Sequence, residues 1–341
     1  MASVFILVIK MKKWIALGFA IIAALVLLLL PNEPKQQYFH HQGNIFGTYY
    51  NIRYEGSVDL HQQIKARLAK FDASLSMFNQ QSVIARINRN EMVCTDSLFE
   101  RMYHEAQIIS RLSNGAFDIT VAPLVNLWGF GLKHGNAADV SQTTIDSIKA
   151  YVGYQKVTLV NHSLLKDDPR ITLDASAIAK GYGTDVVADV LREAGCENYL
   201  VEIGGEVVLK GVNDMGKPWR VGISRPKTDA DGMDEGLQHI IQSSDLCLAT
   251  SGNYLQYYYH EGQRRSHTID PRTGYPVQHG LLSATVVASS CMRADALATA
   301  CMVLGEADAL KMIEQTDDAA CYLIVASGDS LQITVSNNWK Y

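Results

Sequence analysis

The chain has 341 residues, of which 48% are hydrophobic and 19% charged, and its formal net charge is −5. This is ordinary globular composition, with length for one large domain or two moderate ones. Basic residues gather only near the N-terminus and in the Arg264–Arg265 pair, which excludes the basic face of a nucleic-acid-binding protein.

An unbroken apolar run, Trp14–Leu30, follows a cationic front containing Lys10, Lys12 and Lys13. Such a run can start secretion or span a bilayer, and the basic front predicts that the rest of the chain lies outside the cytoplasm. No A-x-A-like cleavage site ends the run, so we expect an uncleaved signal anchor rather than a cleaved signal peptide. The first cysteine is Cys94, which excludes a lipoprotein anchor.

These features predict two parts: a signal anchor and linker over residues 1–35, and one globular domain over residues 36–341. We expect a single-pass protein of the bacterial inner membrane, with the globular domain on the periplasmic side. None of the six cysteines forms a CxxC or Cys/His zinc spacing. They are typical of small buried side chains rather than of a disulfide framework.

The hydrophobic pattern alternates between helical and strand periods along the globular part. Residues 35–42 are polar and are interpreted as a linker. Helices are expected at 60–71, 82–88, 94–112, 139–151, 293–300 and 306–315, and in a segment that Gly195 ends. Strands are expected at 43–54, 117–121, 157–160, 170–173, 199–203, 207–211, 219–223, 246–254, 255–259, 282–288, 320–325 and 330–335. The strands at 157–160 and 170–173 are expected to pair with each other.

Two segments carry candidate chemistry near the end of this pattern. Asp270–Pro276 is a turn, and His267 precedes it near a strand end, where it could act as a general base because its ordinary pKa is near neutral. Asp295 and Thr299 are four residues apart on a helix, so they share one face, and their oxygens suit a hard cation such as Mg²⁺. Each pattern alone is also common in purely structural positions.

Two further segments could hold a ligand. A strand ending at Asp174, a tight turn and a helix with Lys180 in its first turn form an architecture that accepts anions. Gly129 and Gly131 bound an aromatic loop holding Trp128, which could form a wall for a flat ring or simply pack in the core.

Taken together, these segments resemble the FAD:protein FMN transferases, the ApbE family. The matching stretches occur in the family's order between Gly43 and Gly305. They read FGTYYNI, LSMFN, NGAFDITVAPLVNLWGFG, LDASAIAKGYGTD, VEIGGEV, ATSGNY, HTIDPRTGYP and ADALATA. The resemblance implies an α+β catalytic domain with mixed or antiparallel sheets flanked by helices. It also implies FAD as substrate, Mg²⁺ at its pyrophosphate, and transfer of FMN to a threonine hydroxyl of a partner protein with release of AMP.

The resemblance assigns roles to particular residues. His267 is the catalytic base, and the metal is held by the side chains of Asp295 and Thr299 and the backbone carbonyl of Ala177. FAD is contacted by Phe46, Phe78, Leu127, Trp128, Gly129, Asp174, Lys180 and Ile269. Two departures matter: Phe46 and Phe78 stand where other members can carry Met and Tyr, and Ala298 stands where some members have a second metal carboxylate.

The implied acceptor is a flavoprotein subunit resembling the partners of Na⁺-translocating NADH:quinone reductase or of Rnf-type complexes. Two alternatives stay open. The same site could use water and act as an FAD pyrophosphatase that yields FMN and AMP. The chain could instead be a non-catalytic, exported flavin-binding protein, which would need the aromatic loop but neither His267 nor Asp295.

Overall fold

The computed structural model describes residues 36–131, 140–226, 236–253, 257–260, 263–328 and 330–341. The expected anchor at residues 14–30 lies outside these ranges. Within them, no helix is both long enough and apolar enough to cross a bilayer. The chain divides into Met1–Gln37 and a second unit, Tyr38–Tyr341, which contains all the elements described below apart from the first residue of β1.

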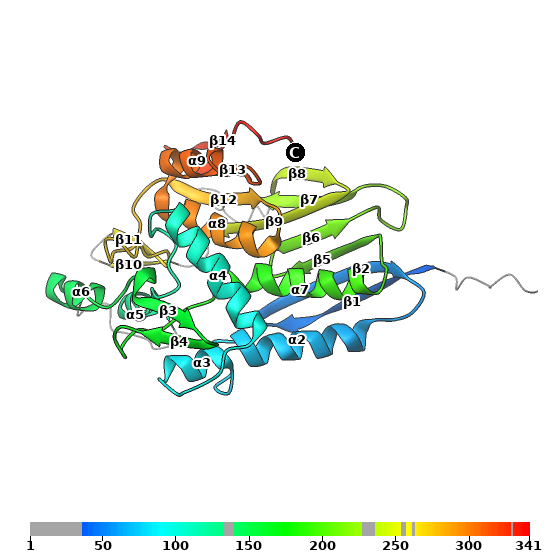
Figure 1. Cartoon of the computed structure of the whole chain (residues 1–341). Coiled ribbons are helices and arrows are strands. Elements are labelled where there is room, and N and C mark those ends of the chain that lie inside the picture. The colour runs from blue at the N-terminus through cyan, green and yellow to red at the C-terminus, as the bar shows by residue number, and fades with distance from the viewer. Residues whose placement is uncertain (1–35, 132–139, 227–235, 254–256, 261–262, 329) are drawn as a thin grey trace, which may run out of the picture. The chain divides into compact units, whose positions relative to one another are not determined.

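An eight-stranded sheet forms the centre of the second unit (Figure 1). From β2 to β14 every neighbouring pair of strands runs antiparallel. In spatial order the strands are β1 (Gln37–Ile45), β2 (Thr48–Gly56), β5 (Tyr199–Ile203), β6 (Glu206–Lys210), β9 (Asp245–Gly252), β12 (Leu281–Val287), β13 (Ala320–Ser327) and β14 (Ser330–Val335). The expected antiparallel α+β fold is therefore confirmed.

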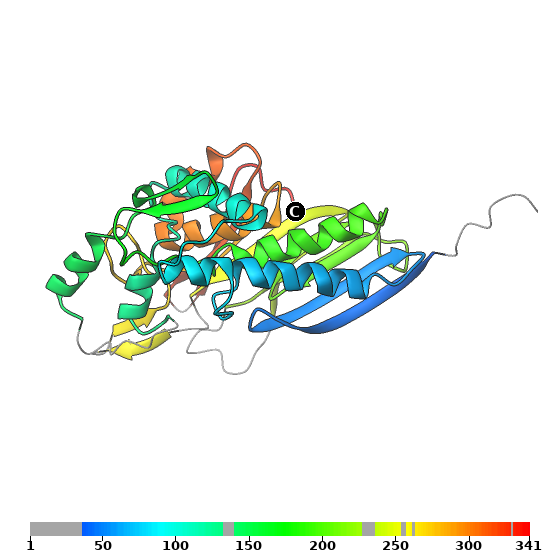
Figure 2. The same cartoon turned by 60° about the horizontal axis from the view of Figure 1, so that its bottom comes forward.

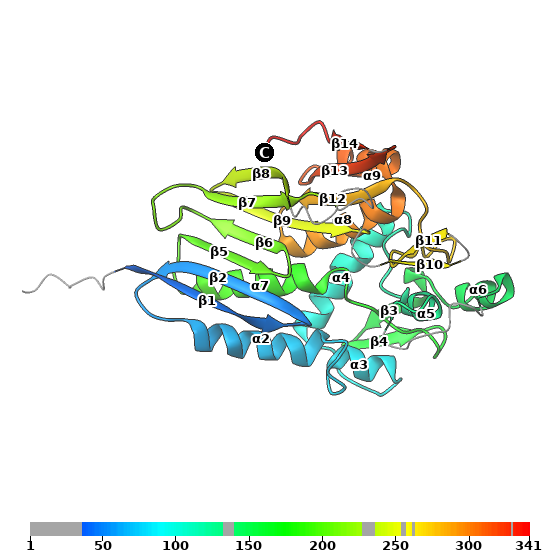
Figure 3. The ribbon, with the colours of Figure 1, turned by 180° about the vertical axis from the view of Figure 1, so that it is seen from behind.

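One face of this sheet is covered by helices, as Figure 2 and the view from behind in Figure 3 show. Strand residues alternate between faces, so Val201 and Ile203 pack against Val187 and Leu191 of α7 (Ala179–Glu193). Leu200 faces the other way, into a cluster with residues of β7 (Trp219–Ser224) and β8 (Leu237–Ser243). These two strands pair with each other in a separate sheet.

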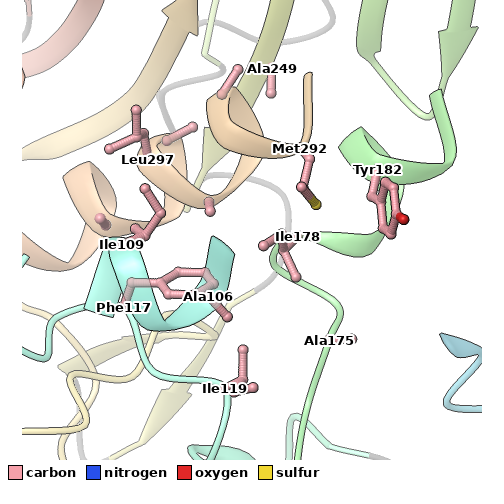
Figure 4. Packing of buried hydrophobic residues seen from close by; sticks show 14 of the residues in the cluster. Ala106, Ile109, Phe117, Ile119, Ala175, Ile178, Tyr182, Ala249, Met292 and Leu297 are labelled. Atoms are coloured by element: carbon pink, nitrogen blue, oxygen red, sulfur yellow. The ribbon is translucent and has the colours of Figure 1, made fainter. Parts of the chain in front are cut away.

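α8 (Cys291–Leu304) is buried almost all round, which is typical of a helix in the centre of a core. Its residues pack against α4 (Ser97–Leu112) and the loop before α7, in one buried cluster that includes Leu297, Met292, Ile109 and Ile178 (Figure 4). The other helices are α2 (His61–Leu75), α3 (Val83–Asn88), α5 (Ala122–Leu127), α6 (Gln142–Lys149) and α9 (Glu306–Glu314). A short 3₁₀ turn, η2, covers Tyr154–Lys156.

Several expected elements are corrected. Residues 37–42 are not linker but part of β1, because this polar strand pairs at the edge of the sheet. Residues 117–121 form turns rather than a strand. Pro123 lies in the first turn of α5, where its missing N–H is not needed. Residues 170–173 are not a strand either. β3 (Val157–Val160) pairs instead with β4 (Ser163–Lys166) across a tight turn at Asn161 and His162.

The remaining hairpin, β10 (Tyr257–His260) and β11 (Gln263–Ser266), stands directly before His267.

The expectation for the cysteines is largely confirmed. All six are free thiols, and Cys196, Cys291, Cys301 and Cys321 are buried.

Candidate functional site

α7 and α8 meet where Asp295 is buried. Its side chain is 2% exposed, and Oδ2 accepts a hydrogen bond of 2.9 Å from the Gly181 backbone N–H. A Cβ at Gly181 would lie 2.3 Å from the Cys291 carbonyl oxygen, so only glycine permits this approach. Burial raises the pKa of Asp295, although Lys180 and the Gly181 hydrogen bond oppose the shift. The carboxylate is thus held rigidly in a low-dielectric environment.

Lys180 stands in the first turn of α7 and forms an ion pair with Glu206, the first residue of β6. Glu206 is 1% exposed, whereas about a third of the Lys180 side chain (34%) reaches the surface. Burial lowers the pKa of Lys180, but the charges of Asp295 and Glu206 outweigh that effect and raise it. Lys180 is therefore a cation, and its side chain is bound to the buried Glu206 while part of it remains accessible from the surface.

Thr299 lies one turn after Asp295 on α8, and its hydroxyl is 3.3 Å from the Ser251 hydroxyl of β9. The predicted carboxylate and hydroxyl are thus on one helix, as expected from their spacing. Ala177 lies in the loop that leads into α7, four residues before Gly181. In the same loop, Asp174 accepts a hydrogen bond of 2.8 Å from the Ser176 backbone N–H.

These donors fit a hard cation. In the described part of the chain, no group of three or more His, Cys, Asp and Glu side chains could hold a metal ion. Mg²⁺ does not require one, because it is commonly bound by one or two carboxylates together with phosphate oxygens and water. The Asp295 carboxylate and the Thr299 hydroxyl are oxygens of the kind that Mg²⁺ prefers, and in the same region one buried oxygen of Glu206 has no hydrogen-bond partner.

Trp128 is buried rather than forming an open wall. Its ring is 3% exposed in a cluster with Ile269, and its indole N–H donates a 2.8 Å hydrogen bond to the Gly274 carbonyl. Leu127 is partly buried against the same cluster, and Gly129 has a φ of 80°. Of the two interpretations of this loop, core packing describes Trp128 correctly. Its hydrogen bond to Gly274 holds the turn that follows His267.

His267 is half-buried directly after β11, and its ring lies 6.4 Å from that of Phe130, edge to face. Ile269 follows it and forms an isolated β-bridge with Pro276. The turn is closed by Arg272, whose guanidinium pairs with Asp270 at 2.9 Å. A rigid turn therefore holds the backbone next to His267, as the sequence predicted.

Phe46 occupies a strained position. It has a φ of 53° in the two-residue turn between β1 and β2, and Gly47 follows with a φ of 74°. A bulky side chain is rarely found there, and such strain persists mainly where a function requires it. The ring lies over α7, since a Cβ at Gly183 would be 2.8 Å from it. Phe78 is 68% exposed.

The structure brings Asp295 and Lys180 together at the start of α7, with Phe46 over the same helix, and Thr299 lies one turn along α8 from Asp295. Leu127 and Trp128 lie in a separate buried cluster with Ile269, and Phe78 is exposed between α2 and α3. Two polar residues were missed, Glu206 and Ser251. The Gly204–Gly205 pair directly before Glu206 was the available signal, because paired glycines at a strand end permit close approach of a ligand.

Comparison with known proteins identifies one family that this chain resembles along most of its length. Residues 46–323 match the model of the ApbE family. The FAD:protein FMN transferase of Vibrio cholerae is 37% identical, over 97% of this chain and 98% of that protein. Its counterpart in Escherichia coli is 35% identical, over 88% of this chain and 87% of that protein.

Solved structures show the same fold. The flavin transferase ApbE from Vibrio cholerae superposes with a TM-score of 0.79 at 36% identity, covering 89% of this chain and 98% of that one. The apo form of the Pseudomonas stutzeri flavinyl transferase ApbE also gives 0.79, at 32% identity, covering 89% of this chain and 95% of that one.

Proposed function

The chain belongs to the ApbE family and is an FAD:protein FMN transferase, and we propose that it uses Mg²⁺ to transfer FMN from FAD to a threonine hydroxyl of a partner protein, releasing AMP. The observation that supports the Mg²⁺-dependent step is the buried Asp295 carboxylate beside the first turn of α7. A pyrophosphate bound there would meet the ammonium of Lys180 and the oxygens that suit a cation.

Phosphoryl transfer depends mainly on positioning and on neutralising the charge of the phosphate oxygens. Bound Mg²⁺ would supply much of that neutralisation. Asp295, Thr299 and the Ala177 carbonyl would hold it, and Lys180 would contribute a second positive charge. The ion pair with Glu206 fixes the Lys180 ammonium in advance, so little reorganisation is needed when the cofactor binds.

His267 is proposed to act on the acceptor. A threonine hydroxyl is a weak nucleophile near neutral pH, and a base assists it as it attacks. The threonine oxygen forms a bond with the phosphorus of the FMN half, and its proton passes to the imidazole. The phosphorus–oxygen bond to the AMP half breaks, and AMP leaves with that oxygen.

The remaining assignments concern FAD binding. We propose that Phe46, Phe78, Asp174 and Lys180 contact the cofactor from the α7 side. Leu127, Trp128, Gly129 and Ile269 would contact it from the side of the His267 turn. The ring of Trp128 is already buried, so it would support the loop from inside. Its contact with FAD would then be made by its backbone atoms and not by the ring face.

The apolar run at residues 14–30 supports a further proposal about location. The chain would be anchored in the inner membrane with the catalytic domain on the periplasmic side. The acceptors would then be exposed flavoprotein subunits of redox-driven membrane complexes, similar to those of Na⁺-translocating NADH:quinone reductase or Rnf-type complexes.

Co-expression tests the transfer itself. The chain is expressed with a candidate acceptor subunit, and the acceptor is digested and examined by mass spectrometry. We expect an FMN adduct on one threonine, which disappears when that threonine is replaced by alanine. Formation of free FMN and AMP without any adduct, over a panel of acceptors, would instead identify an FAD pyrophosphatase.

A further inference from the structure

Glu206 is a buried acid, and only one of its two carboxylate oxygens has a bonding partner. Its side chain is 1% exposed, and one carboxylate oxygen, Oε1, receives the Lys180 ammonium. The other oxygen, Oε2, is buried and has no hydrogen-bond partner. An unpaired buried carboxylate oxygen is costly, so it is expected to have a partner in the working enzyme.

The surrounding charges indicate what that partner is. Burial raises the pKa of Glu206, and the nearby charge of Asp295 raises it further, while Lys180 opposes both. Asp295 is the leading charged neighbour of Lys180 as well. Asp295 and Glu206 therefore share one ammonium in a buried region, so neutralising both carboxylates takes one more positive charge, either a proton or a bound cation. A divalent cation would supply that charge and at the same time give the unpartnered Oε2 of Glu206 a partner.

The placement of Glu206 agrees with this. Glu206 pairs with Ile203 across the β5–β6 hairpin, and Ile203 packs with α7 residues on the helix-covered face of the sheet. Its carboxylate thus lies on the side of Asp295. The neighbouring position on α8, Ala298, is packed in the apolar core with no exposed surface, so it adds no ligand to the cation.

We propose that Glu206 is the second carboxylate of the cation site, with Oε1 holding Lys180 and Oε2 facing the divalent cation directly or through one water. This inference rests on the proposed Mg²⁺ dependence and adds a residue to it. It makes Glu206 the link between the cation and the cofactor-contacting lysine, because one carboxylate would contact both.

Cation binding without FAD tests the proposal separately from turnover. The full-length wild-type chain and its Glu206→Gln variant are titrated with Mn²⁺ alone, and bound Mn²⁺ is measured by electron paramagnetic resonance. Glutamine keeps the size of the side chain and an oxygen for Lys180 but removes the charge. Loss of a group supporting a metal ligand typically weakens metal affinity by about 10–100-fold, and we expect a loss of at least about tenfold.

Glu202→Gln is the matched control. Glu202 lies on the same hairpin, but it pairs with Val207 on the other face of the sheet, and its carboxylate accepts hydrogen bonds from Tyr49 and Asn51. We expect its Mn²⁺ affinity to stay within about twofold of wild type. Equal Mn²⁺ affinities of the wild type and Glu206→Gln would overturn the role of Glu206. Failure of the wild type to bind Mn²⁺ would instead contradict the proposed metal dependence.

A measurement on the wild type covers the case in which Glu206→Gln does not fold. In crystals soaked with Mn²⁺, the anomalous signal of the ion should lie within about 2–5 Å of Glu206 Oε2, the range for direct or water-bridged coordination. A bound Mn²⁺ farther away would overturn the proposal.

Discussion

His267 has one expected task, which is to accept the proton of the acceptor threonine. Replacing it by alanine should lower the rate of flavinylation by about 10²–10⁴-fold, the contribution of a general base. The FAD dissociation constant, measured by flavin fluorescence, should change little, because the imidazole is not assigned to cofactor binding. His40→Ala serves as the control, since His40 is exposed and contacts Asn51 far from the His267 turn in the chain. Near-normal transfer by His267→Ala would remove it as the base.

Asp295 is expected to act through the cation. In Asp295→Asn the side chain can still accept the Gly181 hydrogen bond, but its negative charge is lost. Turnover at low Mg²⁺ should therefore fall, and raising the Mg²⁺ concentration should restore part of it.

The matched control for this variant is Asp189→Asn. Asp189 lies on α7 and pairs with Arg192 at the surface. Its Mg²⁺ dependence should equal that of the wild type. If Asp295→Asn also shows the wild-type Mg²⁺ dependence, the carboxylate does not hold the cation.

The sequence could predict the site residues that lie close together along the chain. Asp295 and Thr299 are one helical turn apart, so their common face follows from helix geometry alone. Glu206 could not be predicted in the same way. It reaches Lys180 from another element, 26 residues away, and only the packing of α7 against the sheet brings the two together. The Gly204–Gly205 pair indicates that a ligand can approach this strand end, but no local pattern shows that the Glu206 carboxylate is buried against Lys180.

The contact between α7 and α8 depends on Gly181. In Gly181→Ala the added Cβ would meet the Cys291 carbonyl at 2.3 Å and Cβ of Asp295 at 2.7 Å, both of which belong to α8. The helices would have to separate, and such overpacking costs about 1–3 kcal/mol. Urea unfolding should show this loss, and Mg²⁺ affinity should fall with it, because Asp295 is displaced.

Gly56→Ala is the control for this prediction. A Cβ at Gly56 would have its closest contacts at 3.5 and 3.6 Å, which is ordinary packing. The two variants should therefore differ clearly in unfolding midpoint. A Gly181→Ala protein as stable as Gly56→Ala would show that the helices are not in close contact.

Strongly periodic elements were predicted well, because their pattern reflects which side is buried. The helices expected at 82–88 and 139–151 form as α3 and α6, and β5, β13 and β14 lie where the apolar runs indicated. Which strands pair with each other was harder to predict. The strand at 157–160 was expected to pair with 170–173, but a tight turn with two left-handed residues lets it pair with 163–166. A polar edge strand such as β1 carries too little apolar pattern to be distinguished from a linker.

Truncation separates the N-terminal segment from the enzyme. A chain that starts at Lys35 keeps all of β1 and every residue assigned to the site, so it should be folded and active with FAD, Mg²⁺ and acceptor. A chain that starts at Thr48 loses β1 and leaves β2 as an open edge, which should promote aggregation. Activity and light scattering of the two proteins check this. An inactive but folded Lys35 chain would show that the preceding residues take part in catalysis.

Transfer and hydrolysis differ in what becomes of each FMN released from FAD. The most direct measurement is therefore to quantify AMP and covalently bound flavin in the same reaction, with purified enzyme, FAD, Mg²⁺ and acceptor. The proposed function predicts one AMP for each flavinylated threonine, and neither product when Mg²⁺ is removed by a chelator. AMP formed together with free FMN and no covalent flavin, or equal product formation without Mg²⁺, would contradict it.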